Sequence, residues 1–304
     1  MPSVRANGIT LEYESMGDPR DPAMVLIMGL GVQMILWPDA FCELLAARGF
    51  HVLRFDNRDA GLSSSMDHLG TPRLWLEYAK YMLHVPVNAP YRIDDMARDT
   101  VGFLDALAIE RAHVVGASMG GMIAQNMAAD FPARVASLTS IMSTTGSRKL
   151  PPPERRALRA LMQPPARAGD IEGATRRFMN VLRAIGSQTY PPDEAELRAF
   201  CERHARRAQN PAGQIRQLVA IAASGDRTAT VRNIRVPTLV IHGDEDPLLR
   251  PACGIATARA IEEGGGDVTL EIVKGMGHDL PVPLQPRLAD LVADFAARAS
   301  TTTA

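Results

Sequence analysis

The sequence contains few cysteines, and they are not grouped as in a metal site. Cys42, Cys201 and Cys253 are odd in number and far apart in the chain, so we expect neither a disulfide framework nor a zinc site. Free, buried thiols in a reducing compartment are the expected state. The chain also lacks a glycine-rich nucleotide-binding loop, and we therefore predict no metal and no cofactor.

Strong charge and long hydrophobic runs are lacking as well. The formal net charge is −1, with no run of like charges, which gives no reason to expect a nucleic-acid or anionic-membrane partner. The longest apolar run, residues 23–32, is about half of a membrane span. Residues 1–8 lack the apolar stretch of a signal peptide. We expect a cytoplasmic protein without a membrane or nucleic-acid partner.

What the chain has is a large hydrophobic content and an alternation of strands and helices. Hydrophobic residues make up 46% of the 304 residues, enough for one large domain with an inserted subdomain. Residues 23–28 are apolar throughout, which is typical of a strand buried on both faces of a parallel sheet. Strand–helix alternation over 23–142 predicts a mostly parallel α/β sheet flanked by helices.

The alternation stops near residue 143 and resumes near residue 236. Residues 143–228 contain proline pairs and arginine-rich helical segments but no convincing strand. We interpret them as a helical cap inserted into a core made of residues 1–142 and 229–304. Because ligands bind at the carboxyl ends of the strands in such sheets, we expect the cap to cover that edge.

The segment Gly116-Ala117-Ser118-Met119-Gly120 has the pattern Gly-x-Ser-x-Gly, between a predicted strand and a predicted helix. A serine on so sharp a turn has a strained backbone, and glycines two residues to either side prevent collisions. The turn would place the Ser118 hydroxyl at a helix N-terminus, which favours negative charge. We predict that Ser118 is a nucleophile. A glycine-rich helix cap is the alternative.

A serine nucleophile requires a base and a group that orients the base. His278 follows the last predicted strand in a glycine-rich loop and is the candidate base. The acid is expected after the strand at 236–242, where Asp244, Glu245 and Asp246 compete. We favour Asp246, since a residue at that point can turn back over the sheet edge, whereas Asp244 fits a turn cap. The order Ser, Asp, His is typical of α/β-hydrolases.

The predicted chemistry also requires an oxyanion hole of two backbone N–H groups. One candidate is Met119, the residue after the nucleophile. The other is Leu30, in the loop that follows the strand at 23–28, with Gly31 as the second choice. Gly29, Met34 and Trp37 are candidate pocket residues, and core packing is the alternative for Met34 and Trp37.

The chain resembles the α/β-hydrolase fold superfamily over nearly its whole length. The resemblance rests on five segments in order: residues 28–31 (MGLG), 56–63 (DNRDAGLS), 116–120 (GASMG), 243–247 (GDEDP) and 277–278 (GH). It is most similar to small esterases of the anthracycline (aclacinomycin) methylesterase type, through residues 27–29, 37–39, 58–59 and 275–278. The resemblance implies a serine esterase fold with a helical cap.

Two positions depart from the superfamily pattern. Most members have His-Gly where this chain has Met28 and Gly29, which leaves the number of backbone donors unchanged and the anchoring of the loop open. Most have glycine after the arginine at the position of Asp59. We interpret Arg58 and Asp59 as structural residues that bond to neighbouring backbone.

These observations predict a carboxylic ester hydrolase acting on a small-molecule ester. The same machinery also serves lactone or C–C bond hydrolysis, perhydrolysis and lyase reactions, and a ligand receptor without turnover is a further alternative. A serine in place of a carboxylate argues against dehalogenases and epoxide hydrolases. The substrate and the oligomeric state do not follow from the sequence.

Overall fold

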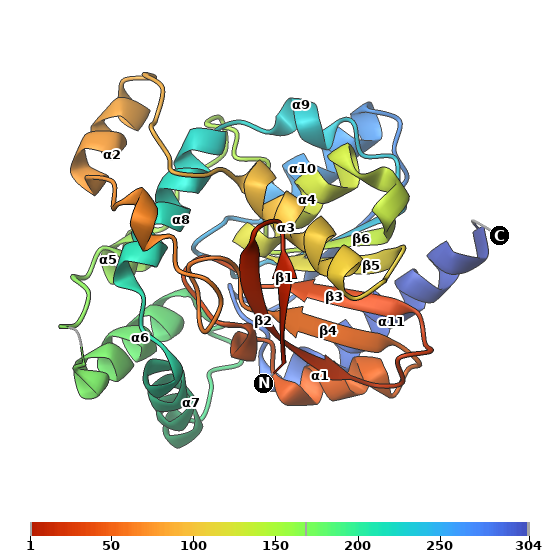
Figure 1. The fold of residues 1–304 in the computed structure, drawn as a ribbon, viewed down its shortest axis with the longest axis horizontal. Coiled ribbons are helices and arrows are strands. Elements are labelled where there is room, and N and C mark those ends of the chain that lie inside the picture. Colours follow the sequence, from red (N-terminus) through yellow and green to blue (C-terminus); the bar gives the residue numbers. More distant parts are fainter. Residues whose placement is uncertain (1, 168, 303–304) are drawn as a thin grey trace.

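The computed structural model describes residues 2–167 and 169–302 and is built on an eight-stranded sheet (Figure 1). The strand order is β1-β2-β4-β3-β5-β6-β7-β8. Strands β3 to β8 run parallel to one another, whereas β2 pairs antiparallel with β4 and β1 pairs antiparallel with β2. The predicted mostly parallel sheet is therefore confirmed. The strands are β1 Ser3–Ala6, β2 Ile9–Met16, β3 Ala23–Ile27, β4 His51–Phe55, β5 Ala112–Ala117, β6 Val135–Ile141, β7 Thr238–Gly243 and β8 Val268–Val273.

Helices cover both faces of the sheet, as the continuously apolar strands require. One hydrophobic cluster joins the sheet to α1 (Asp39–Ala46) and α11 (Gln285–Thr302). A second cluster joins the other face to α3 (Ile93–Ala106), α4 (Met119–Asp130) and α10 (Ala252–Glu263). Every residue of β5 between these layers is buried. This burial holds the end of β5, and the turn that follows it, in a fixed place.

The chain between β6 and β7 forms helices and no strand in its described part, as predicted. Helices α5 to α8 lie together to one side of the sheet, on the left in Figure 1. The predicted boundary between residues 228 and 229 falls inside α9, and the division into core and cap stays a prediction. The helices are α5 Arg155–Leu161, α6 Ile171–Ile185, α7 Glu194–Arg207, α8 Pro211–Ser224 and α9 Thr228–Val231.

Two elements were not anticipated from the sequence. Strand β1 extends the sheet beyond β2, and helix α2 (Leu74–Met82) packs beside α8. Helix α2 turns Trp75 and Tyr78 to solvent and buries Glu77, the reverse of the usual arrangement. Short 3₁₀ helices complete the fold: η1 Met34–Leu36, η2 Asp67–Leu69, η3 Pro132–Arg134 and η4 Val282–Leu284.

All three cysteines are unpaired and buried, as expected. Within the described part of the chain, no helix is both long and apolar enough to cross a membrane.

Candidate active site

The turn between β5 and α4 has the strained geometry that the sequence predicts. Ser118 has φ 57° and ψ −119°, a region that non-glycine residues rarely adopt. A Cβ atom on Gly116 would lie 2.2 Å from the carbonyl oxygen of Gly120. A Cβ on Gly120 would lie 2.0 Å from the carbonyl oxygen of Ile27. Glycine is therefore required on both sides, and the turn holds the Ser118 side chain at the carboxyl ends of the strands.

The three residues selected from the sequence, Ser118, His278 and Asp246, lie in one chain of hydrogen bonds. Nε2 of His278 is 3.0 Å from Oγ of Ser118, and Nδ1 of His278 is 2.7 Å from Oδ2 of Asp246. An ionised carboxylate only accepts, so Nδ1 carries the proton and Nε2 is left to accept from the hydroxyl. Asp246 and His278 are buried, while Ser118 is partly exposed. This arrangement can move a proton from the hydroxyl to the imidazole.

The environment of Asp246 keeps its carboxylate ionised and fixed. Oδ1 accepts the N–H groups of Leu248 and Leu249 at 2.9 Å each. Burial disfavours the charged form, but His278 and His242 outweigh it and hold the pKa of Asp246 well below its usual range. Nε2 of His242 is 3.3 Å from Oδ2 of Asp246 and 2.6 Å from the carbonyl oxygen of Leu249.

The two competing carboxylates point elsewhere. Asp244 accepts the N–H of Gly275 at 2.6 Å. Glu245 accepts hydrogen bonds from Gln188 and Thr189 in the chain after α6. Among the three carboxylates, Asp246 is thus the one that the structure brings to His278.

The loop after β3 lies against the serine. A Cβ on Gly29 would be 3.1 Å from Cβ of Ser118, so the loop backbone adjoins the hydroxyl. The N–H of Gly31 donates to Oε1 of Gln217 at 2.7 Å and is therefore already engaged. This observation favours Leu30 over Gly31 as one donor. Met119 is the first residue of α4, where backbone N–H groups lack partners within the helix.

The segment after β4 anchors this loop, whose anchoring the sequence left open because Met28 replaces the usual histidine. Asn57 donates to the carbonyl oxygen of Met28 at 2.8 Å. Asp56 accepts a hydrogen bond from the N–H of Met34 at 2.7 Å and forms an ion pair with Arg207 at 2.7 Å. Asn57 and Asp56 are almost fully buried. Side chains of this segment therefore fix both ends of the loop.

The expected role of Arg58 and Asp59 is only partly right. Besides backbone contacts, each makes a buried ion pair: Arg58 with Asp99 at 2.5 Å, and Asp59 with Arg216 of α8 at 2.6 Å. Asp59 has φ 66°, a left-handed conformation that glycine adopts without strain. Asp59 tolerates it while joining the core to α8.

The chain after α6 holds the loop that carries His278. The N–H of His278 donates to the carbonyl oxygen of Ile185 at 2.8 Å. The N–H of Gly277 donates to Oγ of Ser187 at 2.7 Å, and Ser187 donates to Asp279 at 2.6 Å. None of these contacts was anticipated, because they depend on how the 143–228 helices pack.

The remaining candidate residues are more deeply buried than a pocket wall requires. Met34 and Trp37 are both 0% exposed, and Trp37 stacks on Phe41 in the core. Core packing is thus the better supported alternative for Trp37. His204 of α7 is half-buried. Its ring packs 4.5 Å from that of Phe178, and burial lowers its pKa to about 4.

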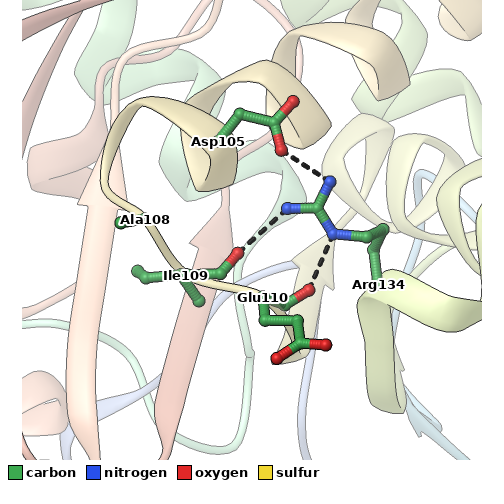
Figure 2. A pocket seen from close by; sticks show the side chains of 5 residues that line it. All are labelled: Asp105, Ala108, Ile109, Glu110 and Arg134. Carbon is green, nitrogen blue, oxygen red and sulfur yellow. Dashed lines mark hydrogen bonds and ion pairs between the residues drawn. The ribbon is translucent and has the colours of Figure 1, made fainter.

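A shallow depression at the opposite edge of the sheet is not part of this site. It has a volume of about 330 Å³ and lies before β5 and β6, at the amino ends of parallel strands (Figure 2). Arg134 donates there to the carbonyl oxygens of Ile109 and Glu110 and pairs with Asp105 at 2.6 Å. We interpret these contacts of Arg134 as structural, since they hold the loop before β5 against η3. Among the described residues, no cluster of His, Cys, Asp or Glu could hold a metal ion.

The fold is that of the α/β-hydrolases, and comparison with known proteins agrees. Residues 22–281 match the family model described as the alpha/beta hydrolase fold, and the chain belongs to that family. It is 31% identical over 315 residues to the rhodomycin D methylesterase DauP of Streptomyces sp. (strain C5), covering 94% of each chain.

Solved structures show the same fold at low sequence identity. The enol-lactonase from Burkholderia xenovorans LB400 superposes with a TM-score of 0.71 at 24% identity, covering 97% of this chain and 100% of that one. A putative aryl esterase from Burkholderia cenocepacia gives a TM-score of 0.74 at 18% identity, covering 99% of both chains.

Proposed function

We propose that the protein is a serine hydrolase that cleaves a carboxylic ester through an acyl-enzyme. The observation that carries the proposal is the hydrogen-bond chain from Ser118 through His278 to Asp246. In the first step, Oγ of Ser118 attacks the ester carbonyl carbon while Nε2 of His278 takes the hydroxyl proton. The protonated imidazole then gives that proton to the leaving alcohol.

The second step reverses the roles. Water enters, Nε2 of His278 removes its proton, and the resulting hydroxide equivalent attacks the acyl-enzyme. The bond between the acyl carbon and Oγ of Ser118 then breaks, the imidazolium returns the proton to Oγ, and the carboxylic acid leaves. Asp246 orients His278 and stabilises the imidazolium in both steps, since its own low pKa keeps it charged throughout.

Both steps pass through a tetrahedral intermediate with a negatively charged oxygen. We assign its stabilisation to the N–H groups of Leu30 and Met119. The supports are the contact of Gly29 with Ser118, the engaged N–H of Gly31, and the start of α4 at Met119. Losing one such donor typically costs about 2.7–4 kcal/mol of transition-state stabilisation.

Ester hydrolysis is preferred over the other reactions of this machinery because a methylesterase is among the similar proteins. A methylesterase shares 31% identity over 94% of both chains, so we propose a methyl or other small-alcohol ester as the substrate class. The helices of residues 143–228 would act as the cap that selects the acyl group. The contacts of this segment with Gly31, Glu245 and Gly277, made from α8 and from the loop after α6, support this role.

The proposal is tested with purified protein and a panel of p-nitrophenyl and methyl esters, lactones and 1,3-diketones. Ser118→Ala should abolish ester hydrolysis while the melting temperature stays close to that of the wild type. Unchanged turnover in Ser118→Ala would refute the proposal. Faster cleavage of a lactone or diketone than of any ester would contradict the proposed substrate class but would leave the assignment of Ser118 as the nucleophile unchanged.

A further inference from the structure

One buried amide of helix α8 bridges the loop after β3 and the segment after β4. Gln217 is 0% exposed. Its Oε1 accepts the N–H of Gly31 at 2.7 Å, and its Nε2 donates to the carbonyl oxygen of Arg58 at 2.7 Å. If the amide were turned over, Nε2 would face the N–H of Gly31 and Oε1 would face the carbonyl oxygen of Arg58, and both hydrogen bonds would be lost. The side chain therefore has one hydrogen-bonded orientation.

The bond to Gly31 fixes the peptide that follows Leu30. A peptide plane contains the carbonyl of one residue and the N–H of the next. Gln217 holds the N–H of the Leu30–Gly31 plane, and Asn57 holds the carbonyl of the Met28–Gly29 plane. The plane between them carries the N–H of Leu30. The proposed oxyanion donor thus lies between two peptides that are each held by a buried side chain.

This loop needs such restraint because glycines flank Leu30. Gly31 has φ 67°, a conformation that glycine adopts without strain. Because glycine has no Cβ atom, it can also leave this conformation easily. Gly29 must be small because a Cβ atom would lie 3.1 Å from Cβ of Ser118. Side-chain sterics therefore do little to hold the peptide on either side of the donor, and hydrogen bonds must do so instead.

We propose that Gln217 is a positioning residue that presents the N–H of Leu30 to the oxyanion. It acts through the loop and touches neither substrate nor the reacting atoms. The inference rests on the proposed function and adds to it a residue of α8 that keeps the oxyanion hole in place. Helix α8 is itself held to the core by the buried ion pair of Arg216 and Asp59. This pair keeps the Gln217 side chain in place against the two loops.

The test compares Gln217→Met and Gln217→Glu with wild type. Met keeps the length of the side chain and loses both hydrogen bonds, whereas Glu keeps an acceptor for Gly31 and loses the donor to Arg58. The readouts are kcat/KM for an ester, and inhibition by a trifluoromethyl ketone, which forms a charged tetrahedral adduct with the serine. The matching methyl ketone, which forms little adduct, reports ground-state binding.

A displaced donor weakens only interactions of the tetrahedral species. We expect kcat/KM to fall about ten- to a hundredfold, somewhat less than for a missing donor. Affinity for the trifluoromethyl ketone should fall by the same factor, and affinity for the methyl ketone by less than about threefold. These losses are expected in Gln217→Met, and smaller ones in Gln217→Glu, which keeps an acceptor for Gly31. The melting temperature of each variant shows whether it is folded.

Gln214→Met is the matched control, since Gln214 lies one turn earlier on α8 and packs against the same glycine. It should leave the ratio of the two ketone affinities unchanged. A folded Gln217→Met variant that keeps wild-type kcat/KM, or that loses affinity for both ketones equally, would overturn the inference. Ser118→Ala is assayed in parallel. If it remains active, the proposed function fails, and the result is distinct from a failure at Gln217.

Discussion

Oδ2 of the Asp246 carboxylate holds Nδ1 of His278 at 2.7 Å. The other oxygen is bound by the N–H groups of Leu248 and Leu249. The carboxylate is therefore fixed in position from one side and orients the imidazole from the other. The neighbouring Asp244 is turned to Gly275 instead. This division of roles can be tested by substitution.

Asp246→Asn should lower kcat for ester hydrolysis by about 10⁴-fold, since the amide favours the wrong tautomer of His278. Asp244→Asn is the matched control and should keep kcat within about tenfold, because it loses a turn contact and not a proton-transfer partner. Steady-state kinetics on one ester measures both. Similar losses in the two variants would argue against the assignment of Asp246 as the acid.

The backbone of Ser118 predicts an unusual stability order. Ser118→Gly should be more stable than Ser118→Ala by about 1 kcal/mol, since a β-carbon at φ 57° and ψ −119° is strained. Both variants lack the nucleophile and should be inactive, so the comparison isolates the backbone. Urea unfolding measures the difference in free energy of unfolding. A more stable alanine variant would show that the turn carries no such strain.

The ion pair between Arg216 and Asp59 should contribute much more to stability than exposed pairs do. Both side chains are fully buried, so Arg216→Met leaves an uncompensated carboxylate and should cost about 3–5 kcal/mol. Arg206→Met breaks the exposed pair with Glu202 and should cost less than about 1 kcal/mol. Equal effects in urea unfolding would contradict the view that α8 is held by a buried charge.

Burial lowers the pKa of His113 to about 4, with Arg111 adding to the effect. Above about pH 6.5 the imidazole is neutral in both folded and unfolded chains. Between about 6.5 and 4 only the unfolded chain takes up the proton, so stability falls as the pH drops, by up to about 1.4 kcal/mol per unit.

His113→Gln removes this titrating group while keeping polar atoms near Ser137. The variant should be less stable than wild type at pH 7, and it should lose less stability between pH 7 and pH 5. Urea unfolding at the two pH values measures both slopes. A variant with the slope of the wild type would place the acid sensitivity elsewhere in the chain.

The sequence was most informative where geometry is local. The strain at Ser118 follows from a strand–turn–helix with glycines two residues away, and φ 57° agrees with it. His278 and Asp246 were found because loops after parallel strands meet at one edge of the sheet. The topology then brings residues that are distant in the chain within hydrogen-bond distance.

The sequence was least informative where helix packing decides the contact. Gln217 and Ser187 look like ordinary helix and loop residues, and only the position of α6 and α8 brings them to the active-site loops. Helix α2 was missed for a related reason. Its apolar positions, including Trp75 and Tyr78, face solvent, so the pattern that normally marks burial gives no guide to its orientation.

The most direct measurement of the proposed mechanism is covalent labelling with a fluorophosphonate, followed by peptide mapping in a mass spectrometer. The wild type should carry one adduct, on Oγ of Ser118, formed in step with loss of esterase activity. His278→Ala should react far more slowly, since the base that activates the hydroxyl is gone. Full inactivation with the adduct on another residue, or with Ser118 unmodified, would contradict the mechanism.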